Sequence, residues 1–267
     1  MSDVSSRPFV VITGGSNGIG YELAKQFVAN GHDVLIAAED PAHLAEAARG
    51  LAASDAQVET HASDLSTEAG VDALFGAIQA LGRPVEVLCV NAGYGLGGAF
   101  VETDLQRELK MIDLNCRGAV QLTKLVLKDM VARDRGKLLF TSSIAATMPD
   151  PFEAVYGSTK VFLRWFGEAL RNELKDTGVG VTVLMPSVTD TNFFHRAEMD
   201  DTKAGASDKK DDPAMVAREA WKALQHDKDK VLPGAKNTIM GGIAEALSDT
   251  ASAAVHRGMS EPGSATK

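Results

Sequence analysis

Cysteine, positive charge and long apolar runs are all scarce in this chain of 267 residues. Cys89 and Cys116 are its only cysteines, and both lie in apolar segments, so we expect neither a disulfide framework nor a thiolate metal site. The net charge of -9 argues against a nucleic-acid-binding protein, which needs a basic surface to displace counterions. No apolar run approaches the roughly 20 residues of a membrane span, and residues 1–8 are too polar for a signal peptide. These absences predict a soluble, cytoplasmic protein.

Short apolar segments alternate with helical patterns along most of the chain, and 45% apolar residues are ample for a core. The expected strands cover residues 9–12, 34–38, 58–61, 85–90, 137–142 and 181–185, with a short last strand near 230. Unbroken alternation of strands and helices predicts one α/β domain built on a doubly wound parallel sheet. We place this domain at residues 9–247, after a flexible N-terminus at 1–8 and before a disordered tail at 248–267.

A glycine-rich turn follows the first expected strand and opens a helix. Its sequence is TGGSNGIG at residues 13–20. Glycines at 14, 18 and 20 let the backbone turn sharply and let a pyrophosphate approach the amides of the helix N-terminus. An isolated glycine motif is weak evidence, but the position between a strand and a helix favours a dinucleotide site.

Two acidic residues follow the second and third strands. Glu39 can accept hydrogen bonds from adenosine ribose hydroxyls and would repel a 2′-phosphate, which favours NAD over NADP. The alternative is that Glu39 is a solvated loop charge, which leaves the choice open. Asp64 can accept from the adenine amino group, or it can serve as a turn or capping residue.

Tyr156 and Lys160 are four residues apart, which places them side by side on one face of an expected helix, and Ser143 precedes the tyrosine by 13 residues. The phenol pKa is ordinarily about 10, so a base working near neutral pH requires roughly 4 kcal/mol of stabilisation of the phenolate. A lysine ammonium and an oxidised nicotinamide ring would together provide that. Tyr21 and Lys25 share the spacing, but Pro8 stands 13 positions before Tyr21 and we interpret that pair as ordinary helix surface.

A long helix is expected from a capping box at Thr103 to about Ala132, and a polar residue interrupts its apolar stripe. The stripe consists of Leu109, Leu114, Leu122, Leu125, Val126 and Met130. Asn115 is the polar residue, and a buried amide must find partners. It either braces the backbone or holds a water molecule for a proton path, and the residues alone favour bracing.

Taken together, these motifs resemble the short-chain dehydrogenase/reductase family over residues 9–247. The resemblance rests on the glycine turn, Asn91-Ala92-Gly93, Asn115, Ser143, and Tyr156 with Lys160, in that order and at compatible spacings. It implies a Rossmann-like fold and an oxidoreductase that interconverts an alcohol and a ketone or aldehyde by hydride transfer with NAD or NADP. A non-catalytic dinucleotide sensor on the same fold is the alternative, and the intact Ser143, Tyr156 and Lys160 set counts against it.

The resemblance also implies individual roles. Tyr156 would be the acid/base, Lys160 would lower its pKa and bind the nicotinamide ribose, Ser143 would bind the substrate oxygen, and Asn115 would position a water. The cofactor would contact Gly14, Ser16, Asn17, Gly18, Ile19, Gly20, Glu39, Asp64, Leu65, Asn91, Ala92, Gly93, Tyr156, Lys160, Pro186, Val188 and Thr191.

The sequence departs from the family pattern in two places. Ser187 stands where the family usually has glycine, and the C-terminal segment lacks the paired glycines of many tetrameric members. We therefore expect a homodimer through helices at 104–132 and 155–176 in preference to a tetramer.

The substrate should be a small molecule held mainly by apolar side chains. The candidates are Tyr94, Leu96, Ala145, Met148, Phe152, Val188, Phe193 and Phe194. Residues 192–212 set two phenylalanines in a charged, small-residue stretch, which indicates a substrate lid, with a plain solvated insertion as the alternative. The apolar bias of the candidates favours a medium-sized hydrophobic alcohol or ketone.

Overall fold

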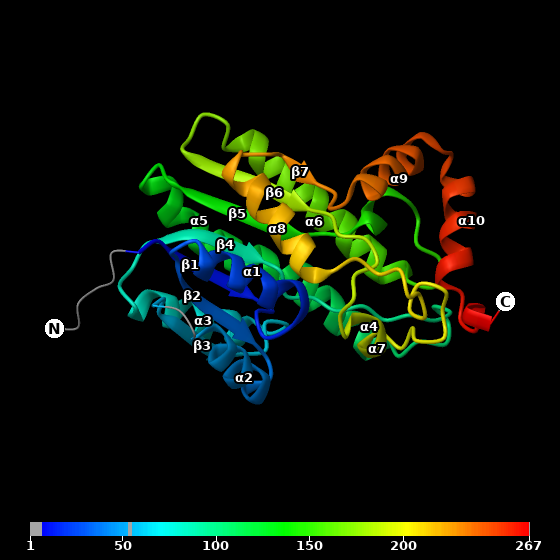
Figure 1. Cartoon of the computed structure of the whole chain (residues 1–267), viewed down its shortest axis with the longest axis horizontal. Helices are drawn as coiled ribbons and strands as arrows, with labels where there is room; N and C mark the ends of the chain where they lie inside the picture. Colours follow the sequence, from blue (N-terminus) through cyan, green and yellow to red (C-terminus); the bar gives the residue numbers. More distant parts are fainter. Residues whose placement is uncertain (1–6, 53–54, 267) are drawn as a thin grey trace.

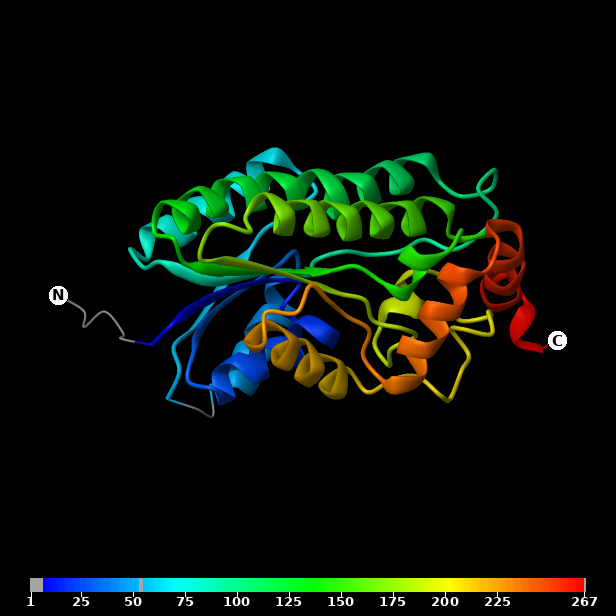
Figure 2. The same ribbon diagram turned by 90° about the horizontal axis from the view of Figure 1, so that it is seen from above.

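A computed structural model of the protein describes residues 7–52 and 55–266. Within these residues, seven parallel strands form one sheet in the order β3-β2-β1-β4-β5-β6-β7. The strands are β1 (Phe9–Thr13), β2 (Asp33–Ala38), β3 (Val58–Ala62), β4 (Val85–Val90), β5 (Gly136–Thr141), β6 (Val179–Leu184) and β7 (Lys230–Val231). Helices lie on both faces of this sheet (Figures 1 and 2). The predicted doubly wound parallel sheet is confirmed.

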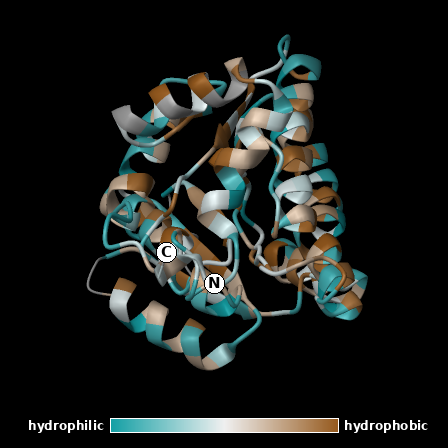
Figure 3. Ribbon diagram, turned by 90° about the vertical axis from the view of Figure 1, so that its right-hand side faces the viewer, coloured by the Kyte–Doolittle hydropathy of each residue, from teal (hydrophilic) through white to brown (hydrophobic). Residues whose placement is uncertain are grey.

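The two faces of the sheet are covered by different sets of helices, as Figure 2 shows. One face packs against α3 (Glu68–Ala80), α5 (Ala119–Ala132) and α6 (Ala154–Glu173). The other face packs against α1 (Gly18–Ala29), α2 (Pro41–Leu51) and α8 (Pro213–Gln225). The remaining helices are α4 (Leu105–Ile112), α7 (Phe193–Arg196), α9 (Ala235–Ala246) and α10 (Asp249–Ser260), with short 3₁₀ turns at 144–147 and 264–266. Hydrophobic and hydrophilic residues are interspersed along the outer helices (Figure 3).

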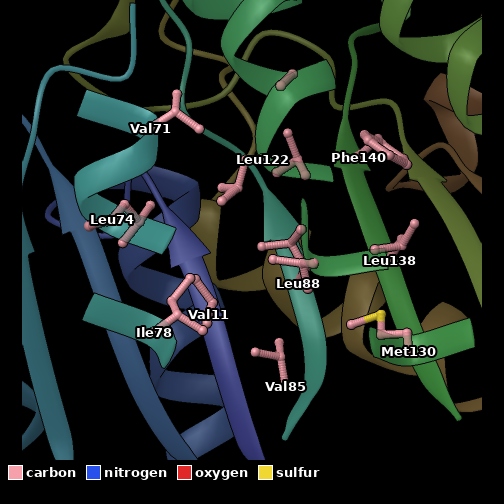
Figure 4. Close-up of a cluster of buried hydrophobic side chains, with 14 of the residues drawn as sticks. Val11, Val71, Leu74, Ile78, Val85, Leu88, Leu122, Met130, Leu138 and Phe140 are labelled. Carbon is pink, nitrogen blue, oxygen red and sulfur yellow. The ribbon is translucent and has the colours of Figure 1, made fainter. Parts of the chain in front are cut away.

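The core on the first face is built from apolar strand residues that meet the inner sides of the helices. Figure 4 shows side chains of β1, β4 and β5 pointing toward those of α3 and α5. Val11, Leu88 and Leu138 have no exposed surface, because parallel strands in a sheet covered on both faces are buried throughout. This explains why the strands could be recognised as continuous apolar segments.

The helix expected over residues 103–132 differs from the prediction in its cap and its regularity. Asp104 is the cap, and its carboxylate accepts from the backbone N–H of Arg107 at 2.9 Å, whereas the Thr103 hydroxyl donates to Glu108. A π-helical turn, Asp113–Gly118, separates α4 from α5. The helix therefore changes its periodicity, and within α4 Glu108 and Met111 are buried while Leu109, assigned to the core stripe, is 45% exposed.

The disorder predicted for residues 248–267 is wrong for the described part of that segment, where α10 forms. The Ser248 hydroxyl caps α10, and Ser252 and Ser260 are buried within it. Low apolar content suggested disorder, but here small polar side chains make the buried contacts instead. Residues 1–6 of the predicted flexible N-terminus lie outside the described residues, as does Lys267.

Candidate active site

A cavity of about 770 Å³ opens at the carboxyl ends of the strands, where parallel α/β sheets bind ligands. β1 lies between β2 and β4, so the strand order reverses direction there. Every residue predicted to contact the cofactor lines this cavity. So do Ser143 and, on the substrate side, Tyr94, Ala145, Met148, Val188, Phe193 and Phe194.

The glycine turn has the backbone geometry that a pyrophosphate cradle needs. Gly14 and Gly18 have φ of +67° and +54°, a conformation that side-chain-bearing residues rarely adopt. A Cβ on Gly14 would lie 2.9 Å from Ala92 Cα, and one on Gly18 would lie 3.1 Å from Thr191 Cγ2. The cradle is thus held open only by glycine, at the N-terminus of α1, and it fits a dinucleotide phosphate.

Asn91 connects the ends of three adjacent strands, as its position after β4 predicts. Its Nδ2 donates to the carbonyl of Thr13 at 3.0 Å, and its Oδ1 accepts from the Thr141 hydroxyl at 3.1 Å. The Thr13 hydroxyl in turn accepts from the backbone N–H of Ala92 at 3.0 Å. These bonds fix the edge of the sheet on which the ligand would lie.

Glu39 and Asp64 face the same end of the cavity, and one lysine joins them. Lys110 Nζ lies 3.2 Å from Glu39 Oε1 and 3.2 Å from Asp64 Oδ2. The other oxygen of Asp64 accepts from the backbone N–H of Ser66 at 2.9 Å, which is the turn role. The Glu39 side chain is 67% exposed in this ion pair, so the alternative of a solvated loop charge stays open, and an adenine contact of Asp64 stays a prediction.

Ser143, Tyr156 and Lys160 come together from the end of β5 and the first turns of α6. Ser143 is near enough to the Tyr156 phenol to lower its pKa, and the Ser143 oxygen accepts from the backbone N–H of Ala145 at 3.1 Å. Lys160 Nζ lies 5.6 Å from the centre of the Tyr156 ring and donates to the carbonyl of Thr141 at 3.0 Å. All three side chains are buried at the cavity wall.

The protein alone does not make Tyr156 acidic, contrary to the expected effect of Lys160. Burial raises the pKa of the phenol, the charge of Glu153 raises it further, and the hydrogen bond from Ser143 opposes both. Burial also lowers the pKa of Lys160 to about 8. The phenol is therefore held in its protonated form, which is the form that donates a proton to a carbonyl oxygen.

Asn115 lies in the π-helical turn, has no exposed surface and does not line the cavity. Its Nδ2 donates to the carbonyl of Tyr94 and to the hydroxyl of Thr159, each at 3.0 Å. Its Oδ1 accepts from the backbone N–H of Tyr94 at 3.2 Å. The side chain braces the segment after β4 against α6, as the residues alone indicated, and the water-holding role stays a prediction.

The substrate side of the cavity differs from the prediction in several residues. Leu96 and Phe152 do not line it, since Leu96 packs in the core beside Met111 and Phe152 lies 5.0 Å below the guanidinium of Arg257. Sequence reasoning missed Glu153, Arg196, Val255, His256, Met259 and Ser260, which do line it. Glu153 stands three residues before Tyr156, so helical spacing could have placed it on the same face of the helix. The residues of α10 could not be found in this way, because that segment was expected to be disordered.

A dinucleotide cradle, a buried Ser-Tyr-Lys set and a cavity at the sheet edge define a nucleotide-dependent oxidoreductase. The sequence model of the short chain dehydrogenase family matches residues 8–202. The chain is 32% identical over 234 residues to dehydrogenase/reductase SDR family member 7B of Rattus norvegicus, covering 84% of this chain and 72% of that protein. It is 33% identical over 199 residues to the NADP-dependent 3-hydroxy acid dehydrogenase YdfG of Salmonella typhi, and the match covers 73% of this chain and 79% of that protein. The chain belongs to the short-chain dehydrogenase/reductase family.

Solved structures agree with this assignment. A short-chain dehydrogenase from Sphingobium yanoikuyae in complex with NADPH superposes with a TM-score of 0.80 at 26% identity, over 90% of this chain and 94% of that one. A short-chain dehydrogenase/reductase from Burkholderia phymatum in complex with NAD has the same fold, with a TM-score of 0.79 at 21% identity. The superposition covers 88% of this chain and 92% of that one. The protein is an oxidoreductase that acts on a CH–OH group or the matching carbonyl with NAD or NADP.

Among the described residues, no helix is long and apolar enough to cross a membrane, and no cluster of three metal-ligating side chains occurs.

Proposed function

We propose that the protein interconverts a ketone and an alcohol with Tyr156 as the acid/base and Ser143 as the second hydrogen-bonding group at the substrate oxygen. The observation that carries the proposal is that Ser143, Tyr156 and Lys160 are all buried at the wall of one cavity, with Lys160 Nζ 5.6 Å from the centre of the Tyr156 ring. When bound, the reduced nicotinamide supplies the hydride. The chain's own part is to hold two donors where negative charge develops on oxygen.

Each of the three residues has a distinct task in the reducing direction. Tyr156 has a raised pKa and is therefore protonated, so it can donate its proton to the carbonyl oxygen. Ser143 orients the same oxygen, because its own oxygen is fixed by the backbone N–H of Ala145. Lys160 is anchored to the carbonyl of Thr141, and with a pKa near 8 it can return a proton toward Tyr156.

NAD is the proposed cofactor in preference to NADP. Glu39 lines the end of the cavity that lies beside β2, where the adenosine ribose would sit, and its carboxylate would bind free ribose hydroxyls. Lys110 partly offsets that charge, so the preference should be moderate.

We propose a medium-sized hydrophobic ketone or alcohol as the substrate. Phe193 stands over the Tyr156 ring with centroids 5.2 Å apart, and Phe194 packs against Phe193. Val255 and Met259 add apolar surface from α10. An apolar wall this close to the acid/base favours an alkyl or aryl group next to the reacting carbon. The segment 192–212, which carries both phenylalanines, remains our candidate for the lid.

A homodimer through the long helices accounts for the exposed apolar side chains on them. Leu105 and Leu109 on α4 and Phe162 and Trp165 on α6 are 61%, 45%, 40% and 59% exposed, and the two helices pack beside each other. Exposed apolar side chains on neighbouring helices are typical of a protein interface. Replacing Leu109 and Trp165 together by glutamate should give a monomer in sedimentation velocity. A cytoplasmic location stays a prediction.

The reaction is tested by following oxidation of NADH and NADPH with a panel of aryl and alkyl ketones. We expect turnover with at least one apolar ketone and loss of it in the variant Tyr156→Phe. A protein that binds the cofactor but turns over none of the carbonyls or the matching alcohols would contradict the proposed reaction and favour the dinucleotide sensor.

A further inference from the structure

The C-terminal helix α10 places a histidine against two buried carboxylates beside the acid/base. His256 Nε2 lies 2.8 Å from Asp150 Oδ1 and 4.0 Å from Glu153 Oε2. Ser260, one helical turn later, donates from its hydroxyl to Glu153 Oε2 at 2.9 Å. The side chains of Asp150, Glu153 and His256 are only 1%, 7% and 15% exposed, so water does little to screen their charges.

α10 is also fastened to the segment that carries the lid candidates. The backbone N–H of Ala204 donates to the carbonyl of Met259 at 3.0 Å, and that of Ala265 donates to the carbonyl of Asp201 at 2.9 Å. Figure 1 shows the red C-terminal helix at one end of the molecule, next to this yellow segment. Val255, His256 and Met259 all line the cavity, so α10 forms part of its wall.

This arrangement is not part of the family core. The family match ends at residue 202, whereas α10 begins at Asp249. Asp150 and Glu153 lie just before and at the start of α6, the helix that carries Tyr156. Two distant parts of the chain therefore meet at the acid/base, and only one of them belongs to the family core.

The charges in this cluster affect one another and Tyr156. Burial and the charge of Asp150 raise the pKa of Glu153 to about 7. Burial lowers the pKa of His256, but the hydrogen bond and charge of Asp150 outweigh it, and the net result is a raised pKa. On α10 itself the other charged neighbour is Arg257, which lies over the Phe152 ring and pairs with Glu261 instead. His256 is thus the cation that faces both carboxylates.

We propose that His256 is a positioning residue of this oxidoreductase: it fastens α10 over the cavity and partly offsets the charge of Asp150 and Glu153, which limits how strongly that charge suppresses ionisation of Tyr156. The inference rests on the proposed role of Tyr156 as the acid/base. Without the imidazolium, Asp150 and Glu153, whose charges both raise the pKa of Tyr156, would lose their cationic partner. Their charge would favour the protonated phenol still more strongly.

The first test is the pH profile of kcat/KM in the variants His256→Gln, Glu153→Gln and the double variant, with a ketone that the wild type reduces and with the matching alcohol. In His256→Gln the apparent pKa assigned to Tyr156, read from the limb of the pH profile that it controls, should rise by about one pH unit for both reduction and oxidation. Adding Glu153→Gln should move it back toward the wild-type position, because one of the two uncompensated charges is removed. A purely structural role of His256 would lower activity without moving the limb.

The matched control is His226→Gln, since His226 lies at the end of α8, where its ring Nδ1 is 2.8 Å from the carbonyl oxygen of Lys222, and it does not line the cavity. Its profile should equal that of the wild type. An unshifted limb in His256→Gln, or a shift that Glu153→Gln does not reverse, would overturn the electrostatic part of the proposal.

The second test does not depend on activity. Trypsin cleavage after Arg257 should be at least about tenfold faster in His256→Gln than in the wild type, because α10 then opens more often. Equal cleavage rates in the wild type and His256→Gln would overturn the claim that His256 holds α10 in place. If the wild type reduces no carbonyl, the reaction proposed above fails, whereas the cleavage rates still decide whether His256 holds α10.

Discussion

Lys110 Nζ is equidistant, at 3.2 Å, from Glu39 Oε1 and Asp64 Oδ2. One ammonium thus connects the loops after β2 and β3 with the helix α4 that follows β4. The Lys110 and Glu39 side chains are 43% and 67% exposed, so the pair adds little stability and can exchange partners when a ligand binds. Its effect should fall on cofactor choice.

The variants Glu39→Gln and Lys110→Gln should change cofactor preference in opposite directions. Removing the Glu39 carboxylate leaves Lys110 available for a 2′-phosphate, so the ratio of kcat/KM for NADH to that for NADPH should fall about tenfold. Removing the lysine leaves the carboxylate uncompensated, so the ratio should rise. Glu46→Gln, at an exposed position of α2 that does not line the cavity, is the control. A ratio unchanged in both variants would show that this end of the cavity does not contact the ribose.

Tyr156→Phe should reduce turnover at least about 100-fold, the lower end for loss of a general acid, and leave cofactor affinity nearly unchanged. The phenol is needed for proton transfer, while the ring that packs against Phe193 is retained. Steady-state kinetics and fluorescence titration with NADH measure the two effects. Tyr21→Phe is a fitting control, because Lys25 Nζ also lies 5.6 Å from that ring, whereas Lys25 pairs with Glu22 and Tyr21 does not line the cavity. Near wild-type turnover in Tyr156→Phe would remove the basis of the acid/base assignment.

The sequence was sufficient to predict the parts of the fold in which local pattern and tertiary position agree. Strands such as Val85–Val90 are buried on both sides, so their apolar runs coincide with their bounds. The glycine turn and the residues at the strand ends were predictable because parallel strands bring their carboxyl ends to one edge. For the same reason the predicted cofactor residues all line one cavity.

The parts that could not be predicted depend on contacts between distant segments. Helix α10 is stabilised by the pairing of Ser260 and His256 with residues more than 100 positions earlier, and no local pattern reports that. α4 buries the charged Glu108, whose carboxylate accepts from the Thr103 hydroxyl, and leaves Leu109 exposed, which an apolar stripe does not predict. The raised pKa of Tyr156 follows from burial and from Glu153, neither of which is visible in the spacing of Tyr156 and Lys160.

The thermal stability of the protein should fall as pH rises from about 5 to 8. The folded-state pKa of Glu153 is about 7, against an ordinary 4.5, so the folded state binds this proton more tightly than the unfolded state. The stabilisation that this proton provides is complete below pH 4.5 and is lost as pH rises through 7. His256 also has a raised pKa, so its contribution is present below about 6.5 and is lost above its folded pKa, with the same sign.

Melting temperatures of the wild type and Glu153→Gln between pH 5 and 8 measure this effect. The variant should show a flatter dependence and should melt higher than the wild type at pH 8, because it carries no ionising carboxyl at that site. Glu173→Gln, on an exposed position of the same helix, should follow the wild type. Because His32, whose pKa is lowered by burial, acts in the opposite direction, the comparison with the variant decides: equal pH dependence of the wild type and Glu153→Gln would contradict the raised pKa of Glu153.

Two glycine-to-alanine substitutions in helices should have opposite effects on stability. A Cβ on Gly157 in α6 would lie 2.5 Å from the Cβ of Asp150, so Gly157→Ala must displace the loop that His256 contacts and should cost about 1–3 kcal/mol. Gly76 in α3 has no atom within 4 Å of its would-be Cβ, and Gly76→Ala should add about 0.5–1 kcal/mol by lowering the backbone entropy of the unfolded chain. Denaturant unfolding measures both changes. Because the displaced loop carries Asp150, trypsin should also cleave after Arg257 faster in Gly157→Ala and at the wild-type rate in Gly76→Ala. Equal stability of the two variants would mean that the loop can move aside without loss, and that Asp150 is not held in place by α6.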